Sequence, residues 1–125
     1  KYINIEALTM ISMASKQILP AVISYTTELA SSIASVEAVG CDASVQKERL
    51  EKVTAELKAM NTALEKLIAD QAAGEKECPK CTAVYYHDTI MADMAALRAP
   101  ADKLEMLVDK DFWPIPTYGD LLFEV

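Results

Sequence analysis

The segment "SVQKERLEKVTAELKAMNTALEKLI", residues 44–68, decides the fold of this chain. Its apolar residues alternate at intervals of three and four, so that they share one stripe of an α-helix: Leu50, Val53, Leu57, Met60, Leu64 and Leu67. Charged residues lie between them, as on a solvated helix face. Because a sustained 3.5-residue period favours shallow packing against other helices, the segment predicts one long helix of an all-α bundle.

Two further stretches with helical spacing flank this segment. The first runs from about residue 3 to residue 39, and its stripe comprises Leu8, Ile11, Ile18, Val22, Tyr25, Leu29, Val36 and Val39. The second opens after "GEKECPK", residues 74–80, and its stripe comprises His87, Ile90, Met94, Leu97, Ala101, Leu104 and Val108. Gly40 and Gly74 are expected at the intervening helix ends, and Asp42 or Ser44 at the next helix start. The fold prediction is an antiparallel up-down-up bundle of three long helices.

Prolines modify this plan at three places, and one of them is Pro100, which interrupts the third stretch and should bend it. Pro20 lies inside the first stretch, where it removes a backbone donor and crowds the preceding turn, so we expect either a kink near residues 17–19 or two separate helices. Pro114 and Pro116 favour extended backbone at the C-terminal end. The predicted organisation is therefore a helical bundle over residues 1–111 and an aromatic and proline-rich tail over residues 112–125.

The tail carries more apolar area than an exposed segment tolerates. It is expected to pack either back on the bundle or on protein outside this sequence. The candidate anchor residues are Phe112, Trp113, Pro114, Pro116, Tyr118, Leu121, Leu122 and Phe123.

The composition excludes several classes of function. The chain has 125 residues and a formal net charge of −7, which disfavours binding to nucleic acid or to an anionic membrane. No apolar run approaches the roughly 20 residues of a membrane span, so we expect no membrane partner. Three cysteines are too few for a disulfide framework, which favours a cytoplasmic location. Because the chain begins at Lys1 rather than Met, we expect it to be a piece of a longer protein.

The motif "CPKC" is the main candidate for chemistry. Cys78 and Cys81 have the spacing of half a zinc site or of a redox pair. Cys41 is expected about 40 Å away at the opposite end of the bundle, given the usual helical rise. His87 is expected to be partly buried near a helix start rather than catalytic. With no phosphate loop or catalytic triad motif, we expect no catalytic, cofactor-binding or metal-binding residue in this chain.

Four stretches of the sequence together point to a known family: "ILPAVISYTTELA" (18–30), "GCDAS" (40–44), "AVYYHDTIMADMAALRAPADKLEMLVD" (83–109) and "WPIPTYGDLLFEV" (113–125). On these stretches the chain resembles the C-terminal end of type III glutamine synthetase. The resemblance implies a parent enzyme, glutamate–ammonia ligase, that joins ammonia to glutamate with ATP and a divalent metal, Mg or Mn. It also implies a homo-oligomer of two stacked hexameric rings. The family's catalytic motifs lie upstream, so the resemblance implies an inactive helical segment that acts in subunit packing and assembly.

Two alternatives remain open at this stage. The chain could be a stand-alone helical interaction module that binds a partner helix along a methionine-rich groove, since it has six methionines. It could also be a redox or zinc module built on Cys78 and Cys81.

Overall fold

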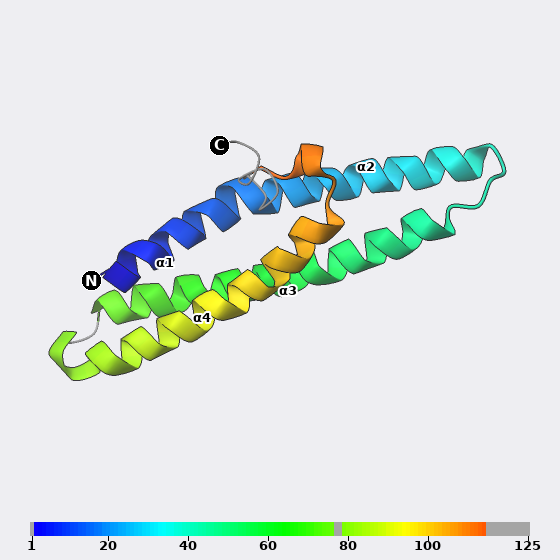
Figure 1. Cartoon of the computed structure of the whole chain (residues 1–125). Helices are drawn as coiled ribbons and strands as arrows, with labels where there is room; N and C mark the ends of the chain where they lie inside the picture. The colour runs from blue at the N-terminus through cyan, green and yellow to red at the C-terminus, as the bar shows by residue number, and fades with distance from the viewer. Residues whose placement is uncertain (1, 77–78, 115–125) are drawn as a thin grey trace, which may run out of the picture.

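The computed structural model describes residues 2–76 and 79–114, with side chains from 5 to 74 and from 87 to 114. In chain order they form helix α1 (Tyr2–Met13), a π-helical turn η1 (Ala14–Ile18), α2 (Leu19–Ala38), α3 (Ser44–Lys76), α4 (Pro79–Leu107) and a short 3-10 helix η2 (Lys110–Phe112) (Figure 1). This described part of the chain contains no strand. The predicted all-α, up-down-up bundle is confirmed.

The three helices do not overlap along their whole length. α1, η1 and α2 form one long helical rod, α3 returns along it, and α4 crosses α3 (Figure 1). The end of α4 turns up toward the middle of the rod, so that α2 and the start of α3 continue beyond it as a two-helix hairpin. Within this hairpin Lys47 pairs with Glu37 across the two helices at 2.5 Å.

One continuous core follows the predicted stripes. Its buried members from α3 and α4 include Val53, Met60, Leu64, Leu67, Ile90, Leu97 and Leu104. From the first rod it takes Ile18, Val22, Tyr25 and Leu29, as predicted, together with Ala7 and Ala14, which were not predicted. Because each packed helix presents one face to the others, this core accounts for the regular spacing in the sequence.

Three of the predicted stripe positions are wrong: Leu8, Val39 and His87, the last with a side chain that is 56% exposed. Leu8 is 45% exposed and Val39 is 76% exposed. On α1 the core position is the neighbouring Ala7, which is fully buried. Val39 follows the last residue of α2 and lies at the turn of the projecting hairpin, where it has no third helix to pack against.

Pro20 acts through the turn that precedes it. The N–H of Leu19 donates to the carbonyl oxygen of Ala14, five residues back, and this spacing defines the π-helical turn. A proline clashes with the carbonyl four residues before it and donates no hydrogen bond, and the wider turn relieves that crowding. The disturbance predicted near residues 17–19 is therefore a π turn, and the rod remains helical on both sides of it.

The turn between α2 and α3 has the residues predicted for it. Gly40 has φ +83°, the left-handed conformation in which glycine is favoured at a helix end. Asp42 accepts hydrogen bonds from the N–H and the hydroxyl of Ser44, the first residue of α3. Gly74 was expected to end a helix in the same way. That prediction is wrong, because α3 continues through Gly74 to Lys76.

We expect Gly40→Ala to destabilise the protein by about 1–2 kcal/mol, the strain of a Cβ in the left-handed region. No atom lies within 4 Å of the position that the Cβ would occupy, so steric contact adds nothing to this strain. The matched control is Gly74→Ala inside α3, where alanine is the better helix former by roughly 1 kcal/mol. Urea unfolding should show opposite signs for the two variants, and equal stabilities would contradict the role assigned to Gly40.

The rod formed by α1, η1 and α2 has more apolar surface than is buried in the core. Residues Ile5–Ala38 reach the length and composition of a membrane-crossing helix, with a mean hydropathy of 1.2 over an 18-residue window. By length and composition, therefore, the expectation that no apolar stretch approaches a membrane span of roughly 20 residues was wrong. Core helices of soluble proteins and signal sequences share these properties, so they assign no membrane role. Only 22% of the window is buried, which leaves much of the rod's apolar surface uncovered in this structure.

Candidate functional site

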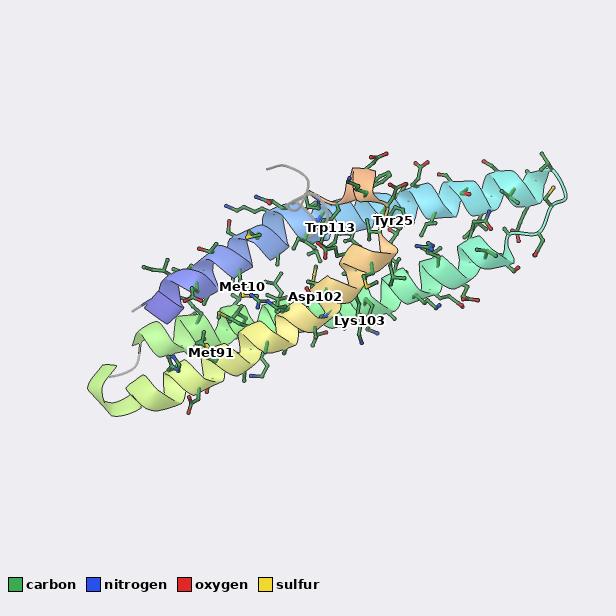
Figure 2. The ribbon with its side chains drawn as sticks, in the orientation of Figure 1. Met10, Tyr25, Met91, Asp102, Lys103 and Trp113 are labelled. Carbon is green, nitrogen blue, oxygen red and sulfur yellow. The ribbon has the colours of Figure 1, made fainter. Side chains whose placement is uncertain are left out.

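The C-terminal end of α4 folds back on the first rod and begins the aromatic tail. The ring of Phe112 lies 5.4 Å from that of Tyr25 on α2, tilted by 57°. Trp113 is only 8% exposed and belongs to the core (Figure 2). The tilted geometry of the Tyr25–Phe112 pair is one in which two aromatic rings attract each other in addition to the gain from burying their apolar area.

Polar contacts define the same chain reversal. A guanidinium nitrogen of Arg49 on α3 donates to the carbonyl oxygen of Leu107, the last residue of α4, at 2.6 Å. The carboxylate of Asp109 then accepts from the N–H of Asp111 at the start of η2. These bonds satisfy backbone groups that a helix end otherwise leaves open.

The predicted anchor residues divide into two sets. Phe112 and Trp113 pack on the bundle, and Pro114 is exposed. The remaining five, Pro116, Tyr118, Leu121, Leu122 and Phe123, lie outside the described residues.

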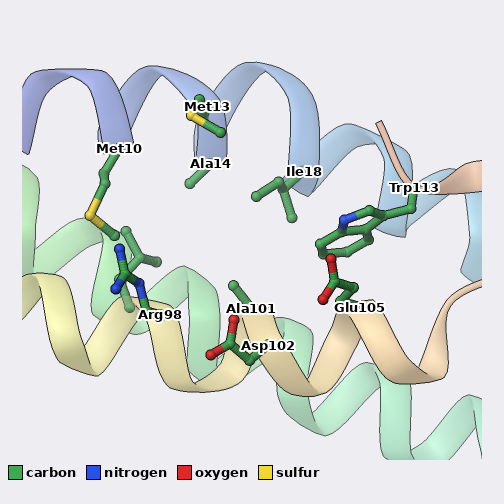
Figure 3. Close-up of a pocket in the computed structure, with 10 residues that line it drawn as sticks. Met10, Met13, Ala14, Ile18, Arg98, Ala101, Asp102, Glu105 and Trp113 are labelled. Atoms are coloured by element: carbon green, nitrogen blue, oxygen red, sulfur yellow. The ribbon is translucent and has the colours of Figure 1, made fainter. Parts of the chain in front are cut away.

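Beside Trp113, a pocket of about 230 Å³ opens between α1, η1 and α4 (Figure 3). Met10 and Ile18 reach into it from the rod, while Asp102 and Glu105 reach into it from α4. Its end wall is Trp113, whose indole Nε1 is buried and has no hydrogen-bond partner among the residues that the structure describes. A buried N–H group without a hydrogen-bond acceptor is uncommon in a protein interior.

A second hollow, of about 410 Å³, continues along the same two helices. It shares Arg98 and Asp102 with the first pocket and adds Glu6 from α1 and Met91 and Met94 from α4. We call the two hollows together the α1–α4 groove. Four of the six methionines of the chain line it: Met10, Met13, Met91 and Met94.

Four charged side chains line the α1–α4 groove. Within the described part of the chain, no ion pair involves Glu6, Arg98, Asp102 or Glu105. Three of these four side chains are acidic, so the groove has a negative rim around an apolar floor.

A separate polar cluster joins α3 to α4 inside the bundle. The ammonium of Lys66 lies 2.9 Å from Asp93 and 2.8 Å from Asp70. Asp93 is only 4% exposed, and one of its carboxylate oxygens has no partner among the described residues. Burial and the neighbouring Asp70 raise the pKa of Asp93, while hydrogen bonds from Asp93 and Lys66 lower the pKa of Asp70. This ion pair, between the buried Asp93 and the largely exposed Lys66, ties α3 to α4.

We expect Asp93→Asn to change how stability depends on pH. A carboxyl whose pKa is higher in the folded state than in the unfolded state binds protons preferentially in the folded state, so its contribution to stability increases as the pH falls toward 3.8. Urea unfolding at pH 7, 5 and 4 should therefore show the stability of the wild type increasing relative to Asp93→Asn as the pH falls. A difference that stays constant with pH would contradict the raised pKa. Asp70 changes the stability in the opposite direction, because its pKa is lowered in the folded state. This effect appears only as the pH falls below the ordinary carboxyl pKa of 3.8.

The motifs singled out for chemistry do not come together in the described part of the chain. Cys41 is exposed at the turn of the hairpin, and the side chains of Cys78 and Cys81 lie outside the described residues. His87 is 56% exposed beside Asp88, so the prediction that it is partly buried is wrong. Between residues 5 and 74 and between 87 and 114, no group of three or more His, Cys, Asp or Glu residues could hold a metal ion.

Comparisons with known proteins show that the chain is similar to glutamine synthetases. Residues 1–37 match the family model of the glutamine synthetase C-terminal domain. The whole chain is 35% identical to a glutamine synthetase of Butyrivibrio fibrisolvens, of which it covers 18%. It is 25% identical over 97% of its length to a glutamine synthetase of Bacteroides fragilis, again covering 18% of that protein. No solved structure matches the chain.

Proposed function

The chain is related to the C-terminal domain of glutamine synthetases, and we propose that it serves such an enzyme as a helical packing element rather than as part of its catalytic centre. The observation that carries this proposal is the similarity to glutamine synthetases over 100% of the chain, although it spans less than a fifth of their length. Fold and sequence together favour a helical element that acts together with a larger body of protein.

Uncovered apolar surface supports the same proposal. Ile5, Leu8 and Ile23 on the rod are each about half exposed, and Met106 on α4 is 86% exposed. Single exposed apolar residues are ordinary, but only 22% of the apolar window on the rod is buried, and extended apolar surface usually marks contact with other protein. An assembly role for the segment follows if the remainder of the enzyme or a neighbouring subunit covers these side chains.

The finer statements about the parent enzyme belong to this proposal as well. We propose that it is a type III enzyme which ligates ammonia to glutamate in the cytoplasm, with ATP and Mg or Mn bound outside this segment. We also propose that it assembles as two stacked hexameric rings. These statements extend the family resemblance of the motifs at residues 18–30, 40–44, 83–109 and 113–125.

The proposal is tested by dividing the enzyme at Lys1. Glutamine synthetase lacking this segment should form smaller or unstable oligomers, measured by mass photometry, and should lose activity as it loses assembly. The isolated chain should show no γ-glutamyl transfer. A full-length enzyme carrying Lys58→Ala, a change on the exposed face of α3, serves as the control. Normal assembly and activity without the segment would refute the packing role, and turnover by the isolated chain would refute its separation from the catalytic centre.

A further inference from the structure

The α1–α4 groove has the dimensions of a docking site for a helix. Along α4 its lining residues extend from Met91 to Glu105. These 14 residue steps correspond to about 21 Å along the helix axis, at about 1.5 Å per residue. This length corresponds to about four helical turns and exceeds what one small metabolite would fill. Its walls are two helices that run side by side with α3 behind them (Figure 1), so a fourth helix in the groove would complete a four-helix arrangement.

The lining of the groove also favours a packed helix. Small side chains, Ala14, Ala95, Ala99 and Ala101, allow a close approach of backbones, and the four methionines adapt to irregular surfaces. A helix satisfies its own backbone hydrogen bonds, whereas an extended segment would bring unpaired N–H and C=O groups onto an apolar floor.

The charge of the groove decides what kind of helix fits. Glu6, Asp102 and Glu105 face one cation, Arg98, and none of the four is paired within the described residues. An incoming helix with lysine or arginine along its edges would complement this rim. A second copy of the same groove would bring two acidic rims together, and like charges oppose that contact.

Trp113 places a hydrogen-bond donor at the end of the groove. Its indole N–H is buried at the end of the first pocket and finds no acceptor among the described residues. A docked segment that carries a carbonyl or a side-chain oxygen at this point would supply the missing bond.

From these observations we infer that the α1–α4 groove receives an apolar helix with basic edges from the remainder of the same enzyme. This inference rests on the proposed function and deepens it, because it names the face of the segment that docks and the chemistry of the element that covers it. Met106, the most exposed large apolar side chain among the described residues, does not line the groove and provides a reference position outside it.

The test places a photoreactive benzophenone amino acid in the full-length enzyme, either at Met10 in the groove or at Met106 outside it. The crosslinked peptides are then identified by mass spectrometry. We expect the probe at Met10 to link to a lysine- or arginine-containing helix of the remaining chain, and the link to be lost when Asp102→Lys and Glu105→Lys reverse the rim charge. The matched control is Glu51→Lys on the exposed face of α3, which should leave the crosslink unchanged.

Other crosslinks would overturn the inference in distinguishable ways. A link from Met10 to residues 115–125 would mean that the chain fills its own groove, and a link between two copies of the groove would mean self-association. A link to the remaining chain from Met106 but not from Met10 would refute the groove as the docking face while leaving the packing role intact. The absence of any link from either position would refute both.

Discussion

Trp113→Ala is expected to lower the free energy of unfolding by about 3 kcal/mol, the lower end of the range for removing a large buried aromatic side chain. Trp113 is 8% exposed and closes the core where α4 folds back on the rod. The effect should lie at the lower end because the side chain borders the existing pocket and buries an N–H that has no acceptor among the residues that the structure describes. Thermal unfolding followed by circular dichroism should show a decrease in Tm of about 10 °C for a loss of this size.

The control for this prediction is Trp113→Phe. It keeps most of the apolar area and removes the buried N–H that has no acceptor among the described residues, so we expect a change within about 1 kcal/mol. Circular dichroism is required because Trp113 is the only tryptophan, and neither variant retains its fluorescence. A loss below about 1 kcal/mol for Trp113→Ala would contradict the assignment of the tail's first aromatic residues to the bundle core.

Leu104→Ala is expected to have an effect of similar size. Leu104 is fully buried in α4 within the common core, and such truncations cost about 2–5 kcal/mol. Met106→Ala two residues further along the same helix removes a side chain that is 86% exposed, so its effect should stay within about 0.5 kcal/mol. Urea unfolding of the pair measures the difference directly. Equal stabilities would mean that α4 does not pack through the face described here.

The sequence predicts the bundle well because its apolar spacing and its core share one cause. The stripe from Leu50 to Leu67 on α3 and that from Ile90 to Val108 on α4 face the other helices as expected. The errors arise where two adjacent apolar residues could both face the core, or where a predicted core position lies at the end of a helix. Ala7 rather than its neighbour Leu8 enters the core, and the hydrophobicity of two adjacent residues does not reveal which of them faces the other helices.

The α1–α4 groove and the Lys66 cluster were harder to foresee. Asp93 resembles an ordinary surface charge in the sequence, yet it lies three residues after Ile90 and four before Leu97, which are core positions. This spacing was the available signal that the carboxylate is buried. The methionine-rich groove was an open alternative in the sequence, but its acidic rim depends on how far α1 and α4 stand apart, and local spacing does not determine that distance. Pro20 signalled a disturbance without specifying a π turn, because several backbone solutions relieve the same clash.

We propose that this chain is the C-terminal packing element of a glutamine synthetase, and sequencing the reading frame upstream of Lys1 in the source DNA tests this proposal. We predict several hundred continuous codons, on the order of two to four further domains of typical size, that encode the glutamate- and ATP-binding core of the enzyme. A stop codon, or a start methionine within a few residues of Lys1, would contradict the proposal and favour a stand-alone helical module that binds its partner through the same groove.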